Sequence, residues 1–270
     1  MFRLNWFAFC LLHCTVMVKG QSNGNFGTAK WLTFEDLLQG DHRACPLFSK
    51  TFVVRKTIKK ASITVTALGV YEAKINGLRI GREYFSPGFT NYNRALPFRS
   101  YDISDELHVG TNHIEVLVGE GWYRGMYRGD KPRDNFGDQP GLMANIVLIY
   151  KDGSRQVVPT DESWQMRWSG IGYSELYNGE FFDSTMKSGK TAVKILNRSS
   201  SLNLERDAVP GIGRHEVFYP VLKREAQASQ LIVDFGQNIA GWVELDVIVE
   251  ILMNVTTTFR RKLTTHSGGN

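Results

Sequence analysis

The sequence has few cysteines, no clustered histidines and no apolar run long enough to cross a membrane. Of the three cysteines among 270 residues, Cys10 and Cys14 lie in an N-terminal apolar run, which leaves Cys45 alone in the rest of the chain. A single cysteine forms no intramolecular disulfide, and we expect Cys45 to be a small buried apolar residue rather than a reactive thiol. The six histidines are scattered, so no Cys/His spacing predicts a zinc site.

The body of the chain carries no net positive charge. The formal net charge is +5, and it is carried entirely by basic residues at the two ends. These residues are Arg3, Lys19, Arg260, Arg261 and Lys262. The body between them is formally neutral and has no electrostatic footprint for a phosphate backbone. We therefore expect no nucleic-acid partner.

The N-terminus is typical of a secretory signal peptide. Arg3 supplies the positive first segment, and residues 6–18 (WFAFCLLHCTVMV) form a mostly apolar run. This run is shorter than the roughly 20 residues of a spanning helix. We expect a signal peptide over residues 1–20, a mature start at Gln21, and a secreted or extracellular protein with no membrane association after cleavage. The alternatives are an uncleaved anchor or a buried strand.

Helical periodicity is also missing, because no segment keeps a clear 3.6-residue apolar period over three turns. Residues 62–68 (SITVTAL) and 113–118 (HIEVLV) instead alternate with a period of two, and residues 143–150 (MANIVLIY) are nearly all apolar, as in a central strand. Asn76 and Gly77 form a strong hairpin signal, because both positions tolerate positive φ. Short strands at spacings of about ten residues predict an all-β fold, in the form of a jelly-roll-like β-sandwich.

Composition divides the chain into successive segments. A polar leader covers residues 21–44, and the predicted sandwich covers residues 45–187. The polar stretch 188–209 is typical of a linker or long loop. Strand signals resume over residues 210–250, which are too few for a complete second sandwich, and residues 251–270 form an atypical tail. The sequence therefore predicts one β-sandwich followed by part of a second.

An ordered series of short motifs resembles one family of carbohydrate-active enzymes. In chain order the motifs are residues 68–72 (LGVYE), 75–77 (ING), 86–90 (SPGFT), 101–103 (YDI), 110–112 (GTN), 119–125 (GEGWYRG), 177–180 (YNGE) with Asp183, and 233–242 (VDFGQNIAGW). The series resembles the N-terminal β-sandwich domain of bacterial-type α-L-rhamnosidases and the start of the sandwich that follows it. Each motif alone is weak, but their shared order from about residue 30 to residue 247 is specific.

The resemblance implies an accessory region without catalysis. In this family the sandwich domains precede a helical (α/α)6 barrel, which supplies the catalytic carboxylates and the sugar pocket. Glycoside hydrolysis usually needs two carboxylates about 5–9.5 Å apart, and no spacing here pairs any two acids. We therefore expect no catalytic residue and a truncated relative of a secreted α-L-rhamnosidase. The alternatives are a free-standing carbohydrate-binding module and a structural sandwich that packs on a partner.

Two clusters combine aromatic and polar side chains in a way that suits sugars. They consist of Asn91, Tyr92, Asn93, Trp122, Tyr123 and Arg124. An aromatic face stacks on the apolar face of a sugar ring, while amides or a guanidinium group bind its hydroxyls. Some members of the family bind rhamnose and calcium through a similar sandwich. We predict that these residues bind rhamnose-containing glycans, and the alternative is packing between strands.

No metal or cofactor is expected, although one loop raises calcium as a minor alternative. The loop carries three aspartates, Asp130, Asp134 and Asp138. Hard cations take such oxygen ligands, but this spacing matches no known calcium loop. Lys131 and Arg133 lie between the aspartates and would oppose a cation.

Two sequons accept N-linked glycans if the source organism is eukaryotic. One begins at Asn197 (Asn-Arg-Ser) and the other at Asn254 (Asn-Val-Thr). Because such glycans are attached to surface asparagines of exported proteins, this prediction depends on the predicted signal peptide as well as on the sequons themselves.

Overall fold

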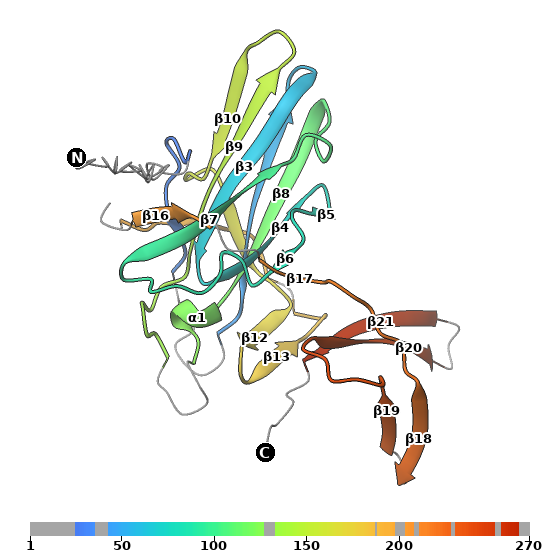
Figure 1. Ribbon diagram of the computed structural model, residues 1–270. Coiled ribbons are helices and arrows are strands. Elements are labelled where there is room, and N and C mark those ends of the chain that lie inside the picture. The colour runs from blue at the N-terminus through green and yellow to red at the C-terminus, as the bar shows by residue number, and fades with distance from the viewer. Residues whose placement is uncertain are drawn as a thin grey trace, which may run out of the picture.

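The computed structural model is almost entirely β-structure (Figure 1), which confirms the predicted all-β class. It describes residues 25–35, 43–126, 133–186, 188–197, 203–207, 211–227, 230–251 and 255–264. Within these residues the only helix is α1 (Gly121–Arg124). No helix in the described part of the chain is long and apolar enough to cross a membrane. The predicted signal peptide, with Cys10 and Cys14, lies outside the described residues.

One large sheet has seven strands in the order β15-β1-β9-β3-β7-β16, with β10 also paired to β9. Its strands are β1 (Leu32–Thr33), β3 (Ile58–Leu68), β7 (Ala95–Asp102), β9 (Gly141–Tyr150), β10 (Arg155–Pro159), β15 (Lys194–Ile195) and β16 (Asn203–Arg206). All pairs are antiparallel except β7 with β16, which run parallel. As the apolar run predicts, β9 is central and has neighbours on both sides.

A second sheet has six strands in the order β14-β11-β2-β8-β4-β5. Its strands are β2 (Pro46–Val54), β4 (Val70–Ile75), β5 (Leu78–Arg79), β8 (Gly110–Gly119), β11 (Gln165–Trp168) and β14 (Thr191–Ala192). The hairpin between β4 and β5 turns at Asn76 and Gly77, whose φ angles are 51° and 83°. Both residues lie in the left-handed region that this two-residue turn requires, as the sequence predicts.

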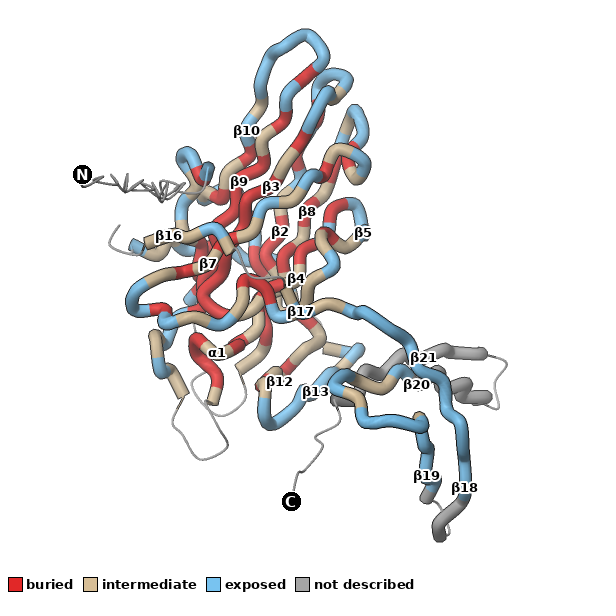
Figure 2. The backbone as a smooth tube through the Cα atoms, viewed as in Figure 1, coloured by how far each residue is buried: buried red, intermediate tan, exposed pale blue. Residues whose placement is uncertain are grey.

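The core lies between these two sheets (Figure 2), and one cluster of buried residues draws on both. In β8 every second side chain points inward, among them Ile114, Val116 and Val118. Ile63 and Val65 of β3 meet them from the other sheet. Burying one such side chain contributes about 1.5–3 kcal/mol, so the alternation that marks the strands also supplies the stability of the sandwich.

Residues 188–209, which we expected to be a linker or long loop, contribute strands to both sheets. The strand β14 pairs with β11 of the six-stranded sheet, while β15 pairs with β1 and β16 with β7 of the seven-stranded sheet. The segment looks polar because these strands are only two to four residues long and contain no buried residue, while the buried Val193 lies between β14 and β15. An alternating pattern needs a longer strand to become visible.

Four short strands form two small additional sheets. They are β6 (Glu83–Tyr84) paired with β17 (Ile212–Gly213), and β12 (Ile171–Glu175) paired with β13 (Gly179–Phe182). The pair of β12 and β13 leaves the end of the sandwich near α1 (Figure 1). Phe181 and Phe182 of β13 are exposed there.

The C-terminal hairpins, by which we mean β18–β19 and β20–β21, each form a separate two-stranded sheet. Their strands are β18 (Leu222–Gln227), β19 (Gln230–Asp234), β20 (Trp242–Ile251) and β21 (Val255–Thr264). The predicted tail therefore contains a strand, because β21 pairs with β20 along its whole length. Apolar residues of the first hairpin are exposed (Figure 2), so within the described residues no second layer covers this hairpin.

Candidate functional site

The two predicted sugar-binding clusters meet beside α1. One is on the loop before β7, and the other is α1 itself, which directly follows β8. The rings of Tyr92 and Tyr123 touch edge to face, with centroids 5.5 Å apart and an interplanar angle of 88°. The structure therefore joins two segments that lie about thirty residues apart in the sequence.

The two tyrosines at this junction are packed inside the protein. Tyr92 is 1% exposed and Tyr123 is 2% exposed, in a cluster with Leu68 and Leu96. The hydroxyl of Tyr92 donates a hydrogen bond to the Gly88 carbonyl oxygen (2.7 Å), and burial raises the pKa of Tyr92 well above its ordinary value. Protein atoms cover both tyrosine rings. The rings therefore hold the neighbouring residues in place and offer no free face to a sugar.

An aromatic patch lies on the surface above these tyrosines, and we define it as Phe85, Phe89 and Trp122. Phe85 is 39% exposed, Phe89 is 54% exposed and Trp122 is half-buried. The ring of Trp122 lies 6.0 Å from that of Phe85 and 5.8 Å from that of Phe89, centroid to centroid. Phe89 also contacts Tyr92 at 6.4 Å, which anchors the patch to the buried cluster.

The asparagines of the first cluster flank this patch in the sequence and are exposed. Asn91 accepts a hydrogen bond at Oδ1 from the Asn93 backbone N–H (3.2 Å), which fixes the turn between them. The sequence prediction missed Phe85 and Phe89. Phe89 could have been found, because it lies in the SPGFT motif two residues before Asn91.

Arg124, predicted to bind sugar hydroxyls, belongs to a buried ion cluster, which we define as Arg43, Glu120, Arg124 and Asp134. Its guanidinium group is 3% exposed and lies 3.2 Å from the Glu120 carboxylate. Arg43 donates two hydrogen bonds to Asp134, at 2.6 and 2.9 Å, and lies 3.4 Å from Glu120. Such bidentate, charge-assisted pairs fix side-chain geometry. The ion cluster thus ties α1 to two loops that are distant in sequence.

Burial controls the protonation of the Glu120 carboxyl group in this cluster. It raises the pKa of Glu120, while the positive charges of Arg124 and Arg43 act in the opposite direction. Nearby, burial raises the pKa of the Cys45 thiol to about 12, so the thiol stays protonated and unreactive. Cys45 is therefore the buried apolar residue that the sequence predicts.

A second buried acid, Glu175 of β12, is held in a similar way. One carboxylate oxygen lies 3.2 Å from the Arg133 guanidinium, and the other accepts a hydrogen bond from the Met126 backbone N–H (2.9 Å). The Arg133 guanidinium also lies over the Tyr173 ring, 5.7 Å from its centroid. Glu175 therefore joins β12 to the loop after α1.

Nothing in the described part of the chain forms a metal site. No group of three or more His, Cys, Asp or Glu side chains is arranged there to hold an ion. Of the three loop aspartates, Asp134 is bound by Arg43 and Asp138 is exposed, while Asp130 lies outside the described residues.

The two N-glycosylation sequons differ in what the structure describes. Asn197 is exposed, as a glycan would require, and Asn254 lies outside the described residues.

Comparison with known proteins places the fold in one family. A family model described as the alpha-L-rhamnosidase N-terminal domain matches residues 56–207. An α-L-rhamnosidase of Formosa agariphila is 27% identical across 83% of this chain and 27% of its own length. A second, from Streptomyces avermitilis, is 29% identical across 71% of this chain and 20% of its own length.

Solved structures agree with the sequence relatives. The native α-L-rhamnosidase from Aspergillus terreus superposes with a TM-score of 0.74 at 29% identity, and covers 85% of this chain and 29% of its own. The enzyme from Dictyoglumus thermophilum gives a TM-score of 0.72 at 27% identity, over 83% of this chain and 27% of its own. The present chain thus spans between 20% and 29% of the length of these four relatives. Since the family match covers more than half of its residues, the chain belongs to the α-L-rhamnosidase N-terminal domain family.

Proposed function

We propose that this chain is a non-catalytic accessory region of a secreted α-L-rhamnosidase, the glycoside hydrolase that acts on terminal α-L-rhamnose. The proposal rests on the observation that the buried acids are held in ion pairs with arginines. Glu120 and Glu175 are bound by Arg124 and Arg133, and neither lines the pocket on the six-stranded sheet, which has no carboxylate among its lining residues.

Two further acids, Asp102 and Glu180, also lack catalytic surroundings. Asp102 accepts hydrogen bonds from the backbone and hydroxyl of Ser104, which lower the pKa of its carboxyl group. Glu180 is exposed on β13. Hydrolysis needs two carboxylates on opposite sides of one glycosidic bond, with one of them able to donate a proton. These acids instead serve as a local turn cap and as part of a solvated strand.

An activity assay tests this proposal. The purified chain should release no rhamnose from an aryl α-L-rhamnoside above the buffer control, while an active α-L-rhamnosidase assayed in parallel does so. Glu180, which is exposed on β13, provides the matched variant. Turnover by the purified chain that disappears in Glu180→Gln, with an unchanged melting temperature, would overturn the proposal.

Export is the second part of the proposal and has its own test. Residues 1–21, fused to a reporter protein, should direct its secretion and be cleaved near Gln21, because a charged start and a short apolar run are recognised by the secretion machinery. Replacing the apolar residues Leu11 and Leu12 by aspartate should abolish the effect. An intracellular reporter that retains Met1 would contradict secretion.

Glycan binding is a second candidate function, and the exposed aromatic patch favours it. Phe85, Phe89 and Trp122 present ring surface to solvent, and the amides of Asn91 and Asn93 are exposed nearby in the chain. A shallow site of this kind makes few contacts against the entropy lost on binding, so we expect a Kd of roughly 10⁻⁴–10⁻³ M for rhamnose. Calorimetry with rhamnose and with an unrelated neutral sugar measures it. No heat up to about 10 mM rhamnose would exclude this function.

Packing on the rest of a rhamnosidase is a third candidate, which the exposed aromatics of β13 favour. Tyr177, Phe181 and Phe182 are all exposed on the hairpin of β12 and β13. Exposed aromatic side chains are enriched at interaction sites. If this hairpin packs on a partner, Phe181→Ser with Phe182→Ser should raise the solubility of the isolated chain and leave its melting temperature unchanged. A lower melting temperature would show that the rings support the sandwich itself.

A further inference from the structure

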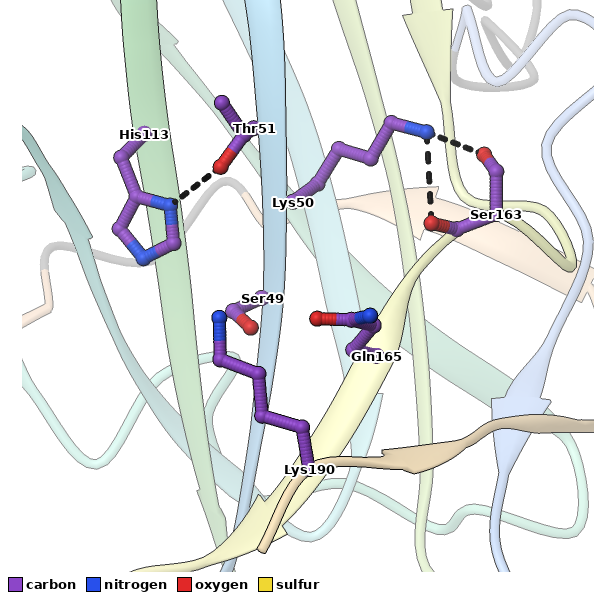
Figure 3. A pocket seen from close by; sticks show the side chains of 7 residues that line it. All are labelled: Ser49, Lys50, Thr51, His113, Ser163, Gln165 and Lys190. Atoms are coloured by element: carbon purple, nitrogen blue, oxygen red, sulfur yellow. Dashed lines mark hydrogen bonds between the residues drawn. The ribbon is translucent and has the colours of Figure 1, made fainter.

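A small polar pocket lies on the face of the six-stranded sheet that points away from the core. Its volume is about 180 Å³, and Figure 3 shows the residues that line it. They are Ser49, Lys50, Thr51, His113, Ser163, Gln165 and Lys190. Every one of them is polar, and no carboxylate is among them. The pocket is separate from the aromatic patch, whose residues contribute nothing to it.

Strand pairing builds the floor of this pocket. Ser49 of β2 pairs with Gln165 of β11, and Thr51 of β2 pairs with His113 of β8. Directly opposed residues in antiparallel strands hold their Cβ atoms about 4.5–5.5 Å apart, so these four side chains have fixed spacing. His113 is oriented further by a contact of 3.1 Å between its Nδ1 and the Thr51 hydroxyl.

Two lysine ammonium groups give the pocket its charge. Lys50 Nζ is turned toward Ser163, and donates to its hydroxyl and to its backbone carbonyl oxygen (3.4 Å). The side chain of Lys190, from the segment before β14, extends toward Ser49 (Figure 3). Within the described part of the chain, no acceptor or acid binds the Lys190 ammonium group. Its positive charge is therefore available at the pocket.

Three acids lie around the pocket, and each contacts a neighbouring residue. Glu115 lies 3.6 Å from His113 and 3.4 Å from Arg167, and Glu162 pairs with Lys30 at 2.5 Å. Asp161 accepts hydrogen bonds from the backbone N–H and the hydroxyl of Ser163. The lining itself carries two lysines and no carboxylate, and such an excess of positive charge in a concave site attracts anions.

We propose that this pocket binds one anionic group of an acidic saccharide, a carboxylate or a sulfate. The Lys190 ammonium would supply a charge-assisted hydrogen bond, and the Ser49 and Thr51 hydroxyls with the Gln165 amide would bind the remaining oxygens. The volume is smaller than the roughly 300 Å³ at which pockets for drug-sized ligands begin, so it accommodates a single charged group or one sugar unit. This site does not depend on the proposed accessory role.

Titrations of the full chain at low ionic strength test the proposal. Sodium glucuronate, glucose and sodium sulfate are the three probes, and binding is followed by calorimetry and by the His113 imidazole resonances. We expect glucuronate to bind in the millimolar range, glucose not to bind, and added sodium chloride to weaken the binding of glucuronate. Binding of inorganic sulfate alone, or equal binding of glucose, would overturn the proposal.

Lysine variants assign the binding to this pocket. Lys190→Gln removes the unpaired charge from an exposed side chain and should weaken glucuronate binding by at least about tenfold with an unchanged melting temperature. Lys194→Gln is the matched control, because Lys194 is exposed nearby in the chain but pairs with Glu35 at 2.8 Å. It should bind as the parent chain does. Equal affinities for the parent chain and Lys190→Gln would place the anion elsewhere and refute the site.

Discussion

The sandwich and the C-terminal hairpins differ in what covers their apolar side chains. Ile63 lies in a strand of the sandwich and is fully buried, whereas Ile232, in the short apolar run of β19, is 42% exposed. The strand of Ile63 has antiparallel neighbours on both sides, whereas β19 pairs with β18 as a two-stranded sheet. A hairpin without a second layer is at best marginally stable in water. A local apolar pattern thus indicates a strand, while further strands and a facing sheet are needed to make that strand stable.

The largest effect is expected when the ion cluster of the sandwich loses a cation. Arg124→Met leaves the buried Glu120 carboxylate without its partner at 3.2 Å. Removing one member of a buried pair costs about 3–5 kcal/mol of unfolding free energy. Urea denaturation measures the loss, with Lys30→Met in an exposed pair as the control. Equal losses in the two variants would show that the cluster lies outside the cooperative unit of the sandwich.

The same variant should show a characteristic dependence on pH. Burial raises the pKa of Glu120, so its carboxyl group takes up a proton more readily in the folded chain than in the unfolded chain. The contribution of such a group to stability falls as the pH rises through its raised folded pKa. Without Arg124 that pKa rises further. We therefore expect a smaller loss from Arg124→Met near pH 5 than near pH 8, and a loss that does not change with pH would contradict this explanation.

A matched pair of isoleucine variants compares the two regions directly. Ile63→Ala opens a cavity between the sheets and should cost about 2–5 kcal/mol of unfolding free energy. Ile232→Ala removes a side chain that is already 42% exposed, and should cost less than about 1 kcal/mol. Urea denaturation of both variants against the parent chain provides the measurement. Similar losses would mean that something covers β19 in solution.

Hydrogen exchange should separate the two regions without any substitution. The amides of β9 sit between neighbouring strands in a buried sheet, whereas those of β18 and β19 have a single partner strand. Local opening of such a hairpin needs far less free energy than opening of a core strand. We expect residues 231–234 to exchange at least about a hundred times faster than residues 143–150. Comparable protection in both segments would contradict the inference that the C-terminal hairpins are less stable than the sandwich.

The smallest effect on stability is expected at the aromatic patch, where function rather than folding should change. Trp122→Ala removes a half-buried ring and should lower the melting temperature by only about 2–4 °C, which corresponds to about 1 kcal/mol. If the patch binds rhamnose, calorimetry should detect no heat with this variant. Phe181→Ala, in β13 and outside the aromatic patch, is the control and should bind as the parent does. A sharp fall in melting temperature would instead make Trp122 part of the core.

Local patterns in the sequence were sufficient for the strands of the sandwich. The alternation in residues 62–68 and the apolar run in residues 143–150 appear as β3 and β9, which pair with each other in the middle of one sheet. Asn76 and Gly77 gave the turn between β4 and β5, because few residue pairs tolerate its φ angles. Strands of two residues, such as β14 and β15, carry too few positions for any period to be recognised.

The site was less accessible to sequence reasoning because its contacts join distant residues. Arg43 and Asp134 are 91 positions apart in the sequence, and no local sequence pattern predicts such a pair. Arg124 was predicted as a sugar ligand because it follows two aromatic residues, but the helix turns its guanidinium group inward to Glu120. Phe85 adopts a φ of 56°, which is unusual for a bulky residue and is set by the surrounding structure.

The strands in residues 188–209 also protect the sandwich against pairing with other copies of the molecule. These strands, β14, β15 and β16, occupy three of the outermost positions in the two large sheets. An uncovered outermost strand offers free N–H and C=O groups, onto which another chain can add a strand. A chain that stopped at residue 187 would expose β11, β1 and β7 in this way and tend to polymerise. The polar segment therefore protects these edges of the sandwich from pairing with another chain.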